Sequence, residues 1–197
     1  DDPTDEEGLI SVDGVPFLGS VQDAVSAASS SVLLCPGTYA EQLTISNDVA
    51  LSSLNGASET ILDATGLGGS VVDIQSGEVS LSGVTLYGGE GTAGVAPSGD
   101  VGGGLVVSSV DPVSLSDMIV MGNIADYGGG IYLDEGTDVL AEDVEVSDNS
   151  ANEFGGGIFM ESATFVGVNL LLQSNQGVTG GALQVDGFSD LRLVDCE

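Results

Sequence analysis

Carboxylates are the side chains of this sequence with the greatest capacity for chemistry. The chain of 197 residues contains 31 Asp and Glu residues against one basic residue, Arg192, with no Lys and no His, and its formal net charge is −30. Without histidine, no nucleophile can be paired with a histidine base. Nucleic-acid binding depends on Lys and Arg contacts with phosphates, so the composition excludes a nucleic-acid partner. Binding of divalent cations and acid–base work by paired carboxylates remain.

The acidic residues recur along the chain at a nearly constant spacing. Two columns can be traced: Asp117, Asp143, Asn169 and Asp195, and Asp134, Glu161 and Asp186. If this period is one coil of a solenoid, neighbours in a column lie about 4.8 Å apart. Carboxylates at that separation suit calcium, which is therefore the candidate cofactor at the second column and at Asp117 and Asp143. The same separation approaches that of glycosidase carboxylate pairs.

Asparagines follow the same period and precede clusters of glycine. Asn123, Asn149 and Asn175 are equally spaced, with the same step as the first acidic column, and the first two are followed by Gly-Gly-Gly. Stacked asparagines at a turn can hydrogen-bond along the axis, so we expect a structural ladder here. We expect the first acidic column to have the same structural role. The glycine clusters indicate turns and not phosphate loops, because no lysine is present and no helix signal follows them.

The segments between these columns have the periodicity of strands. Residues 139–146 alternate with a period of two, interrupted by a turn at Asp143, and their inward residues are apolar: Val139, Ala141, Val144 and Val146. Short strands and tight turns that recur with a period of about 26 residues are typical of a parallel β-helix. The sequence therefore predicts an all-β, right-handed parallel β-helix of about seven coils.

One domain is expected, preceded by an acidic segment. Residues 1–19 begin without methionine and suit a tether, and residues 20–197 form the β-helix. Val21, Ala24 and Val25 fall at helical spacing, which predicts a short helix near 20–29 that caps the open end of the stack. The last coil has no such signal, and the chain ends in mid-coil. We expect a fragment, or an end that another subunit covers by self-association.

An insertion interrupts the period between residues 87 and 101. The apolar pattern that begins at Val79 recurs only at Val113, which is a longer step than one period, so one turn is expected to bulge out as a loop. Surface loops often recognise partners, which makes four polar residues binding candidates: Glu90, Thr92, Ser98 and Asp100. A tolerated insertion without function is the alternative.

No disulfide is expected between the two cysteines. Cys35 and Cys196 should lie about six coils apart, which is beyond the reach of a disulfide.

Two parts of the chain resemble known proteins. Residues 20–25 (Ser-Val-Gln-Asp-Ala-Val) and 34–41 (Leu-Cys-Pro-Gly-Thr-Tyr-Ala-Glu) resemble the opening of pectin-lyase-like β-helix proteins. The Asn-x-Ala-x-x-Gly-Gly-Gly-Ile repeat of residues 123–131 is similar to repeats of polymorphic outer-membrane and autotransporter-type surface proteins. The resemblance implies a parallel β-helix at an extracellular or cell-surface location. It does not select one function, because this superfamily contains lyases, hydrolases, esterases and adhesins.

The catalytic sets implied by the resemblance are incomplete in this chain. Pectate lyases use an Arg or Lys base beside calcium, and only Arg192 is present; pectinesterase-like sites need paired Asp with Arg and Trp, and tryptophan is absent. We therefore expect an extracellular structural or adhesin-like module without catalytic activity. A β-helix that binds or cleaves carbohydrate is one alternative, and a subunit of a filament built by end-to-end coil stacking is another. No apolar run is long enough to span a membrane.

Overall fold

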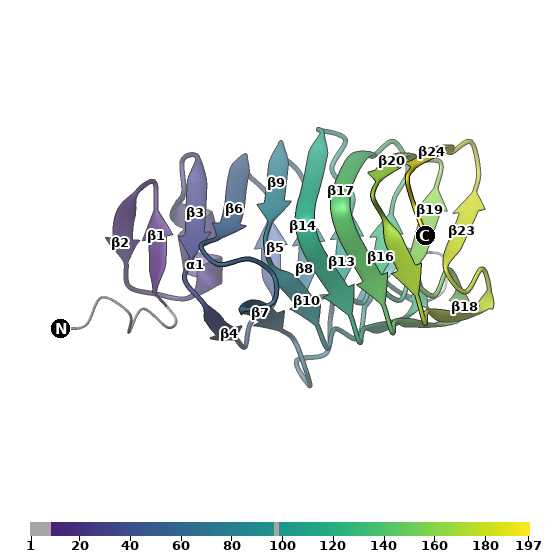
Figure 1. The fold of residues 1–197 in the computed structure, drawn as a ribbon, viewed down its shortest axis with the longest axis horizontal. Coiled ribbons are helices and arrows are strands. Elements are labelled where there is room, and N and C mark those ends of the chain that lie inside the picture. Colours follow the sequence, from purple (N-terminus) through teal and green to yellow (C-terminus); the bar gives the residue numbers. More distant parts are fainter. Residues whose placement is uncertain (1–8, 97–98) are drawn as a thin grey trace.

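The chain is a stack of coils along one long axis. The computed structural model describes residues 9–96 and 99–197. The coils form three sheets, in which strands from successive coils lie side by side (Figure 1). This is the right-handed parallel β-helix that the regular period predicts.

A six-stranded sheet takes one strand from each coil and so counts about six turns, close to the seven expected. Its strands are β5 (Leu43–Ile45), β8 (Val72–Ile74), β13 (Leu105–Val107), β16 (Ile131–Leu133), β19 (Ile158–Glu161) and β23 (Leu183–Asp186). Neighbouring strands pair in parallel, for example Ile131 with Ile158 and Leu133 with Met160. The first and third residues of the first five strands belong to the core, because side chains alternate between the two faces of a sheet.

A thirteen-stranded sheet makes up the largest face. Its strands are β1 (Ile10–Val12), β2 (Val15–Phe17), β3 (Ser31–Leu34), β4 (Gly37–Tyr39), β6 (Val49–Ser53), β7 (Thr60–Asp63), β9 (Val79–Ser82), β10 (Thr85–Tyr87), β14 (Val113–Met121), β17 (Asp138–Ser147), β20 (Thr164–Val168), β21 (Leu171–Gln173) and β24 (Asp190–Val194). The long strands β14 and β17 connect the two halves of this sheet. β14 pairs with β9 over its first half and with β10 over its second half, and β17 pairs in the same way with β20 and β21.

A bend in the large sheet coincides with the first acidic column. Asp117 and Asp143 interrupt β14 and β17 with φ angles of 51° and 54°, and Asn169 has a φ of 54° between β20 and β21. One left-handed residue turns the strand, and Asp and Asn tolerate this conformation better than most residues. An earlier coil has Gly83, with a φ of 66°, between β9 and β10. The column is therefore a set of backbone corners, and its side chains lie on the outer surface.

The third sheet has five strands, and its first two form an unexpected hairpin. The strands are β11 (Thr92–Ala96), β12 (Gly99–Val101), β15 (Ile124–Tyr127), β18 (Ser150–Phe154) and β22 (Gln176–Thr179). β11 and β12 are antiparallel to each other, and β12 continues in parallel with β15. The segment predicted to bulge out as a loop is thus largely a β-hairpin whose backbone hydrogen bonds extend a sheet of the β-helix.

The asparagine column is a hydrogen-bonded ladder between the large and the five-stranded sheets. Asn123 Nδ2 donates to Asn149 Oδ1 at 3.0 Å, and Asn149 Nδ2 donates to Asn175 Oδ1 at 3.1 Å. The same oxygens accept hydrogen bonds from the backbone N–H groups of Asn123 and Asn149. At the N-terminal end, Gly89 N donates to Asn123 Oδ1. Each amide thus satisfies polar groups of two adjacent coils in a buried place, where an unmade hydrogen bond would be costly.

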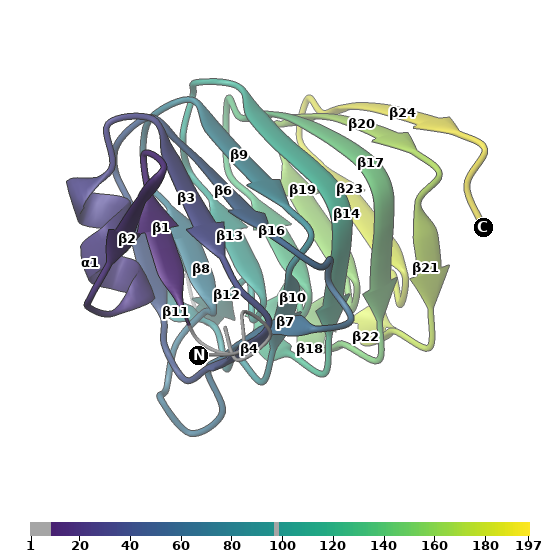
Figure 2. The ribbon, with the colours of Figure 1, turned by 60° about the vertical axis from the view of Figure 1, so that its left-hand side comes forward.

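A helix lies at the N-terminal end of the stack (Figures 1 and 2). Helix α1 (Val21–Ala27) begins with a capping box, in which Ser20 Oγ accepts a hydrogen bond from Asp23 N and Ser20 N donates to the Asp23 carboxylate. The carboxylate of Glu41 accepts hydrogen bonds from the first two helical N–H groups. The inward face of the helix is fully buried and joins the core: Val21, Ala24 and Val25. Placed in this way, the helix shields the apolar interior of the first coil.

The hairpin β1–β2 extends the large sheet beyond the first coil, where β1 pairs with β3 and a carboxylate in the hairpin turn adds further hydrogen bonds. Asp13 lies in its turn with a φ of 50°. Its two oxygens accept hydrogen bonds from the backbone N–H groups of Ser29, Ser30 and Ser31 and from the hydroxyl groups of the first two. These hydrogen bonds lower the pKa of the Asp13 carboxyl far below its usual value. The hairpin is thereby tied to the start of β3.

Candidate functional site

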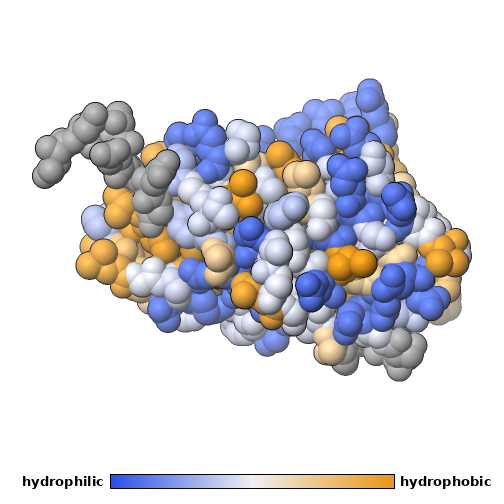
Figure 3. All heavy atoms as spheres, turned by 90° about the horizontal axis from the view of Figure 1, so that it is seen from below, coloured by the Kyte–Doolittle hydropathy of each residue, from blue (hydrophilic) through white to orange (hydrophobic). Residues whose placement is uncertain are grey.

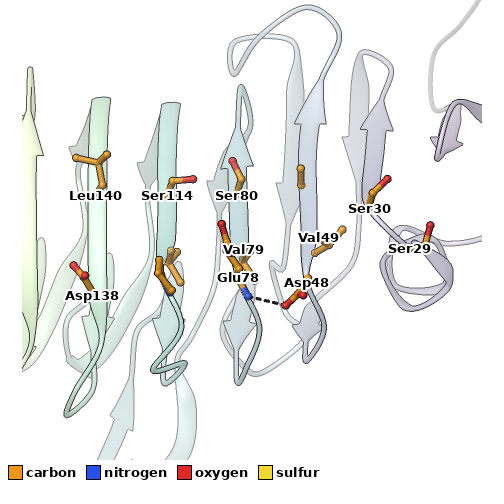
Figure 4. Close-up of a pocket in the computed structure, with 13 residues that line it drawn as sticks. Ser29, Ser30, Asp48, Val49, Glu78, Val79, Ser80, Ser114, Asp138 and Leu140 are labelled. Atoms are coloured by element: carbon orange, nitrogen blue, oxygen red, sulfur yellow. Dashed lines mark hydrogen bonds between the residues drawn. The ribbon is translucent and has the colours of Figure 1, made fainter.

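A groove crosses the outer face of the large sheet, perpendicular to its strands (Figure 4). Its volume is about 500 Å³. The floor is formed by Ala50, Ser80, Ser114 and Leu140, which occupy equivalent positions on β6, β9, β14 and β17. Residues of one row are about 4.8 Å apart from strand to strand. Three of the four floor residues are small, so their side chains leave the space above the sheet open.

Carboxylates line one side of this groove. Asp48, Glu78 and Asp138 lie at or just before the first residues of β6, β9 and β17, and all three are exposed. Asp48 Oδ1 accepts a hydrogen bond from Glu78 N at 3.0 Å. Figure 4 shows these acidic side chains beside the serines of the floor. The groove thus presents hydroxyl groups and acceptor-only carboxylates in successive coils, a set suited to a ligand rich in hydroxyl donors.

A second groove follows the bend of the large sheet and contains part of the first acidic column. Asp117, Asp143 and Asn169 line it together with Glu145, and its volume is about 580 Å³. Asn169 Nδ2 donates a hydrogen bond to Asp143 Oδ1 at 2.8 Å. The sequence therefore located a column that the fold does assemble. Asp143, which could form a glycosidase-type pair with Asp117, is therefore already engaged in a structural hydrogen bond.

The second acidic column lies at the ends of strands in the six-stranded sheet. Glu161 pairs with Asp186 in register, and Asp134 directly follows β16. Glu161 Oε2 accepts a hydrogen bond from the Tyr132 hydroxyl at 2.7 Å, and the other two carboxylates accept from the backbone N–H of the residue that follows them. Within residues 9–96 and 99–197, no three Asp, Glu, Cys or His side chains converge as a metal site. Calcium at this column or at Asp117 and Asp143 has no support from the geometry.

An aromatic cluster covers the outer side of the six-stranded sheet next to this column. Tyr132 is completely buried although it points away from the core, and its ring stacks on that of Phe159 with centroids 5.6 Å apart. Tyr127 and Phe154 pack against this pair. Burial, followed by the hydrogen bond to Glu161, raises the pKa of the Tyr132 hydroxyl well above its usual value. Tyr132 is therefore a fixed neutral donor within a packed cluster.

The inserted hairpin holds three of its four candidate binding residues close to the body of the β-helix. Thr92 Oγ1 lies 2.7 Å from the hydroxyl oxygen of Ser70, and Asp100 N donates a hydrogen bond to Asp126 Oδ2. Glu90 N donates to Gly69 O, and its side chain is exposed. Ser98 lies outside the described residues. The structure thus places Thr92 at a wall of a further groove, over β5 and β8.

Asp73 is the residue that the sequence reading missed. It is the central residue of β8, between the inward Val72 and Ile74, and its carboxyl is partly buried in the groove over β5 and β8. Burial raises the pKa of this carboxyl, while a hydrogen bond from Gln75 opposes the shift. The alternation of Asp73 with apolar neighbours indicates that its side chain points away from the core. Thr92 of the hairpin β11–β12 lines the same groove, and pattern alone did not reveal this neighbour.

The remaining surface is mixed in character. Figure 3 shows one face on which hydrophilic residues are interleaved with smaller apolar groups. Cys35 and Cys196 are half-buried, and no disulfide joins them. The Cys196 thiol lies within hydrogen-bonding distance of Gly167 O. Among the described helices, none is long and apolar enough to cross a membrane. Self-association through the C-terminal coil stays a prediction.

Comparison with known proteins identifies the fold. No protein-family model matches the chain, and no curated protein matches it either. Two solved structures are similar, both of the pectin methylesterase from Aspergillus niger, in a deglycosylated form and in a penultimately deglycosylated form. Each has a TM-score of 0.50 and 12% sequence identity, and the match covers 96% of this chain and 85% of the esterase chain. At this identity the likeness shows the fold alone. The resemblance to autotransporter-type repeats stays a prediction.

Proposed function

Starting from a pectin-lyase-like parallel β-helix, we propose that this protein is an extracellular module that binds a polysaccharide in the groove across the large sheet. The observation that carries the proposal is the row of hydroxyl groups and carboxylates in the coils from β6 to β17. An extended polymer lying across the strands meets a hydroxyl group or a carboxylate in each coil: Asp48, Glu78 with Ser80, Ser114, and Asp138. The similar solved structures are of an enzyme named for pectin, which is itself a polysaccharide.

The charge of the protein selects the class of polysaccharide. A net charge of −30 repels polyanions, and the groove itself contains three carboxylates. Neutral chains can donate hydroxyl hydrogens to these carboxylates, and chains with amino groups gain electrostatic attraction as well. We therefore propose a neutral or positively charged polysaccharide, free in a matrix or on the surface of a host cell.

We propose binding without catalysis. No histidine or lysine is present, and Arg192 lies on β24, two coils beyond the last strand of the groove floor. Carboxyl groups are the most abundant side chains left to act as a general acid or base. In the acidic column at the bend, the Asn169 amide donates a hydrogen bond to Asp143 Oδ1, so one carboxylate oxygen there is already engaged. The proposal therefore joins two expectations from the sequence, an extracellular surface module and a β-helix that binds carbohydrate.

The test is binding of the full chain to soluble β-glucan, xylan, chitosan and polygalacturonate, measured by calorimetry. We expect binding to at least one of the first three and none to polygalacturonate. Ser114→Leu fills the floor of the groove with the residue that the next coil already has, and should raise the Kd by about tenfold or more. Ser116→Leu, on the same face of the strand but outside the groove, is the matched control.

A further variant separates the two ligand classes. Asp138→Asn removes a charge but keeps an acceptor, so it should weaken binding of chitosan more than binding of a neutral glucan. Failure of β-glucan, xylan and chitosan to bind overturns the proposal, whether or not polygalacturonate binds. So does equal binding by Ser114→Leu and the wild type.

A further inference from the structure

A loop beside the bend of the large sheet contains an Asn-Gly pair. Asn55 and Gly56 lie between β6 and β7, and no other asparagine of the chain precedes a glycine. In such a pair the backbone nitrogen of the glycine can attack the side-chain amide carbon of the asparagine, because no Cβ atom stands in its way. The reaction requires an accessible amide and a nitrogen that is not held elsewhere. Both conditions depend on the fold.

The side chain of Asn55 meets the first condition. It is exposed, and its Nδ2 atom donates a hydrogen bond to Glu59 Oε2 at 2.9 Å. This contact lies on the surface and within the same loop, so water reaches the amide. A Cβ atom placed at position 56 would have no heavy atom within 4 Å beyond its neighbours in the chain. No other part of the fold therefore covers the pair on that side.

The backbone nitrogen of Gly56 meets the second condition. It donates a hydrogen bond to Ser53 Oγ at 2.9 Å, which is a side-chain acceptor three residues earlier. Gly56 has a φ of 90° and lies outside the strands, so its N–H group is not part of the pairing between coils. A hydroxyl group can rotate away without breaking any backbone hydrogen bond. A local movement is thus enough to release the nucleophile.

The asparagines of the ladder provide a contrast within the same molecule. The residues that follow Asn123, Asn149 and Asn175 donate their backbone N–H groups to carbonyl groups of an adjacent coil. The first two of these asparagines are also buried. Attack by the following nitrogen would break contacts between coils, and each following residue has a side chain that hinders it. The fold thus protects these amides and leaves Asn55 open to attack.

Two Asp-Gly pairs have the same glycine but a less reactive side chain. Asp13 precedes Gly14, and Asp186 precedes Gly187. Aspartate side chains are ionised at neutral pH, and a carboxylate carbon resists attack by a nucleophile, whereas a neutral amide carbon does not need to be protonated first. In addition, hydrogen bonds hold the pKa of the Asp13 carboxyl far below its usual value. The Asn-Gly pair is therefore the reactive one.

We infer that Asn55 is a site of intramolecular deamidation. The Gly56 nitrogen forms a bond with Asn55 Cγ, the Cγ–Nδ2 bond breaks, and the proton of the Gly56 N–H group leaves with the amide nitrogen as ammonia. Water then opens the cyclic imide at one of its two carbonyl carbons, which gives aspartate or isoaspartate at position 55. The reaction consumes water and needs no oxidant, reductant or other co-reactant.

The products change one wall of the groove at the bend. Gly56 and Ala57 line this groove together with residues of the first acidic column. Each reaction adds a negative charge in the loop of Glu59, whose carboxylate accepts a hydrogen bond from Asn55 before the reaction. Like charges in one loop repel each other, and isoaspartate also lengthens the main chain by one carbon atom. The change is irreversible and accumulates with the age of the protein.

Prolonged incubation of the full chain in warm neutral buffer, followed by peptide mass spectrometry and an ammonia assay, tests the inference. We expect aspartate and isoaspartate at position 55 and intact amides at the ladder positions. Asn55→Gln keeps an amide but needs a larger ring for the same attack, so it should lower the rate of ammonia release by about tenfold or more. Asn152→Gln replaces another exposed asparagine and is the matched control, which should release ammonia as the wild type does.

Isoaspartate distinguishes this reaction from direct hydrolysis of the amide, which gives aspartate alone. An intact amide at position 55 after incubation overturns the inference, and so does aspartate without isoaspartate or equal ammonia release by Asn55→Gln and the wild type. Asn55 does not line the groove proposed for polysaccharide. Asn55→Gln should therefore retain polysaccharide binding, and Ser114→Leu should retain deamidation, so the failure of either proposal is recognised independently.

Discussion

Asp13 shows how much one carboxylate contributes to the start of this fold. It turns the hairpin β1–β2 and accepts hydrogen bonds from three consecutive backbone N–H groups, those of residues 29–31. Only the ionised form can accept all of them together with the two serine hydroxyls. The low pKa of Asp13 is the consequence, since each donor stabilises the charged form.

A pH dependence follows from this shift. The folded pKa of Asp13 lies below the unfolded value of 3.8, so its contribution to stability is fully present above about pH 4 and decreases as the pH falls toward the folded pKa. We expect the difference in unfolding free energy between the wild type and Asp13→Asn to be constant from pH 7 to pH 4 and to shrink at pH 3. Urea unfolding at each pH measures it.

Asp190→Asn provides the control for this experiment, because it removes one exposed charge that accepts no side-chain hydrogen bond among those described. A difference for Asp13→Asn that is the same at pH 3 and pH 7 would contradict the proposed anchor.

Other residues show where sequence reading reached its limit. The asparagine ladder was predictable, because identical residues at one period must stack when the coils stack. The partly buried carboxyl of Asp73 was not, because no acidic residue recurs at its position in the neighbouring coils, where Thr44 and Val106 pair with it. Periodicity identifies what the coils share and not where they differ.

At the level of elements, the bend of the large sheet depends on single left-handed residues. A β-branched side chain tolerates this conformation poorly, whereas glycine adopts it freely. We expect Asp143→Val to be less stable than Asp143→Gly by about 1–2 kcal/mol. Both variants lose the hydrogen bond with Asn169, so the difference between them isolates the backbone effect. Chemical denaturation of the two variants provides the measurement.

Glu142→Val is the matched control, since it places the same residue one position earlier in the strand, at an exposed site without a left-handed φ. Equal stability of the Val and Gly variants at position 143 would show that the bend tolerates any residue. The turn at Asp143 was expected from the sequence. The sequence did not show that β17 continues through this turn, with its strand pairing resuming shortly after Asp143.

For the whole molecule, unbalanced charge is the dominant property. The 31 carboxylates face one basic residue, and coils stacked about 4.8 Å apart bring like charges close together. Salt shortens the Debye length from about 10 Å at 0.1 M to about 3 Å at 1 M and screens this repulsion. We expect the midpoint of urea unfolding to rise between 0.1 and 2 M NaCl.

A variant with fewer charges distinguishes screening from general salt effects. Replacing four exposed acidic residues by their amides should reduce the dependence on NaCl: Glu135→Gln, Glu142→Gln, Glu153→Gln and Asp190→Asn. If the variant and the wild type respond equally to salt, repulsion between carboxylates is not the cause. The fold itself was predictable at this scale, because a repeated inward column leaves few ways to bury it.

The asparagine ladder has a consequence for the size of such a protein. Each amide joins its own coil to the adjacent one, and its pattern of donors and acceptors is the same at every step. Adding or removing one complete period would leave every remaining step intact, since no contact in the ladder reaches beyond a neighbour. Length is therefore a property that duplication can change without redesign, and the distance between two surface sites becomes a multiple of one coil.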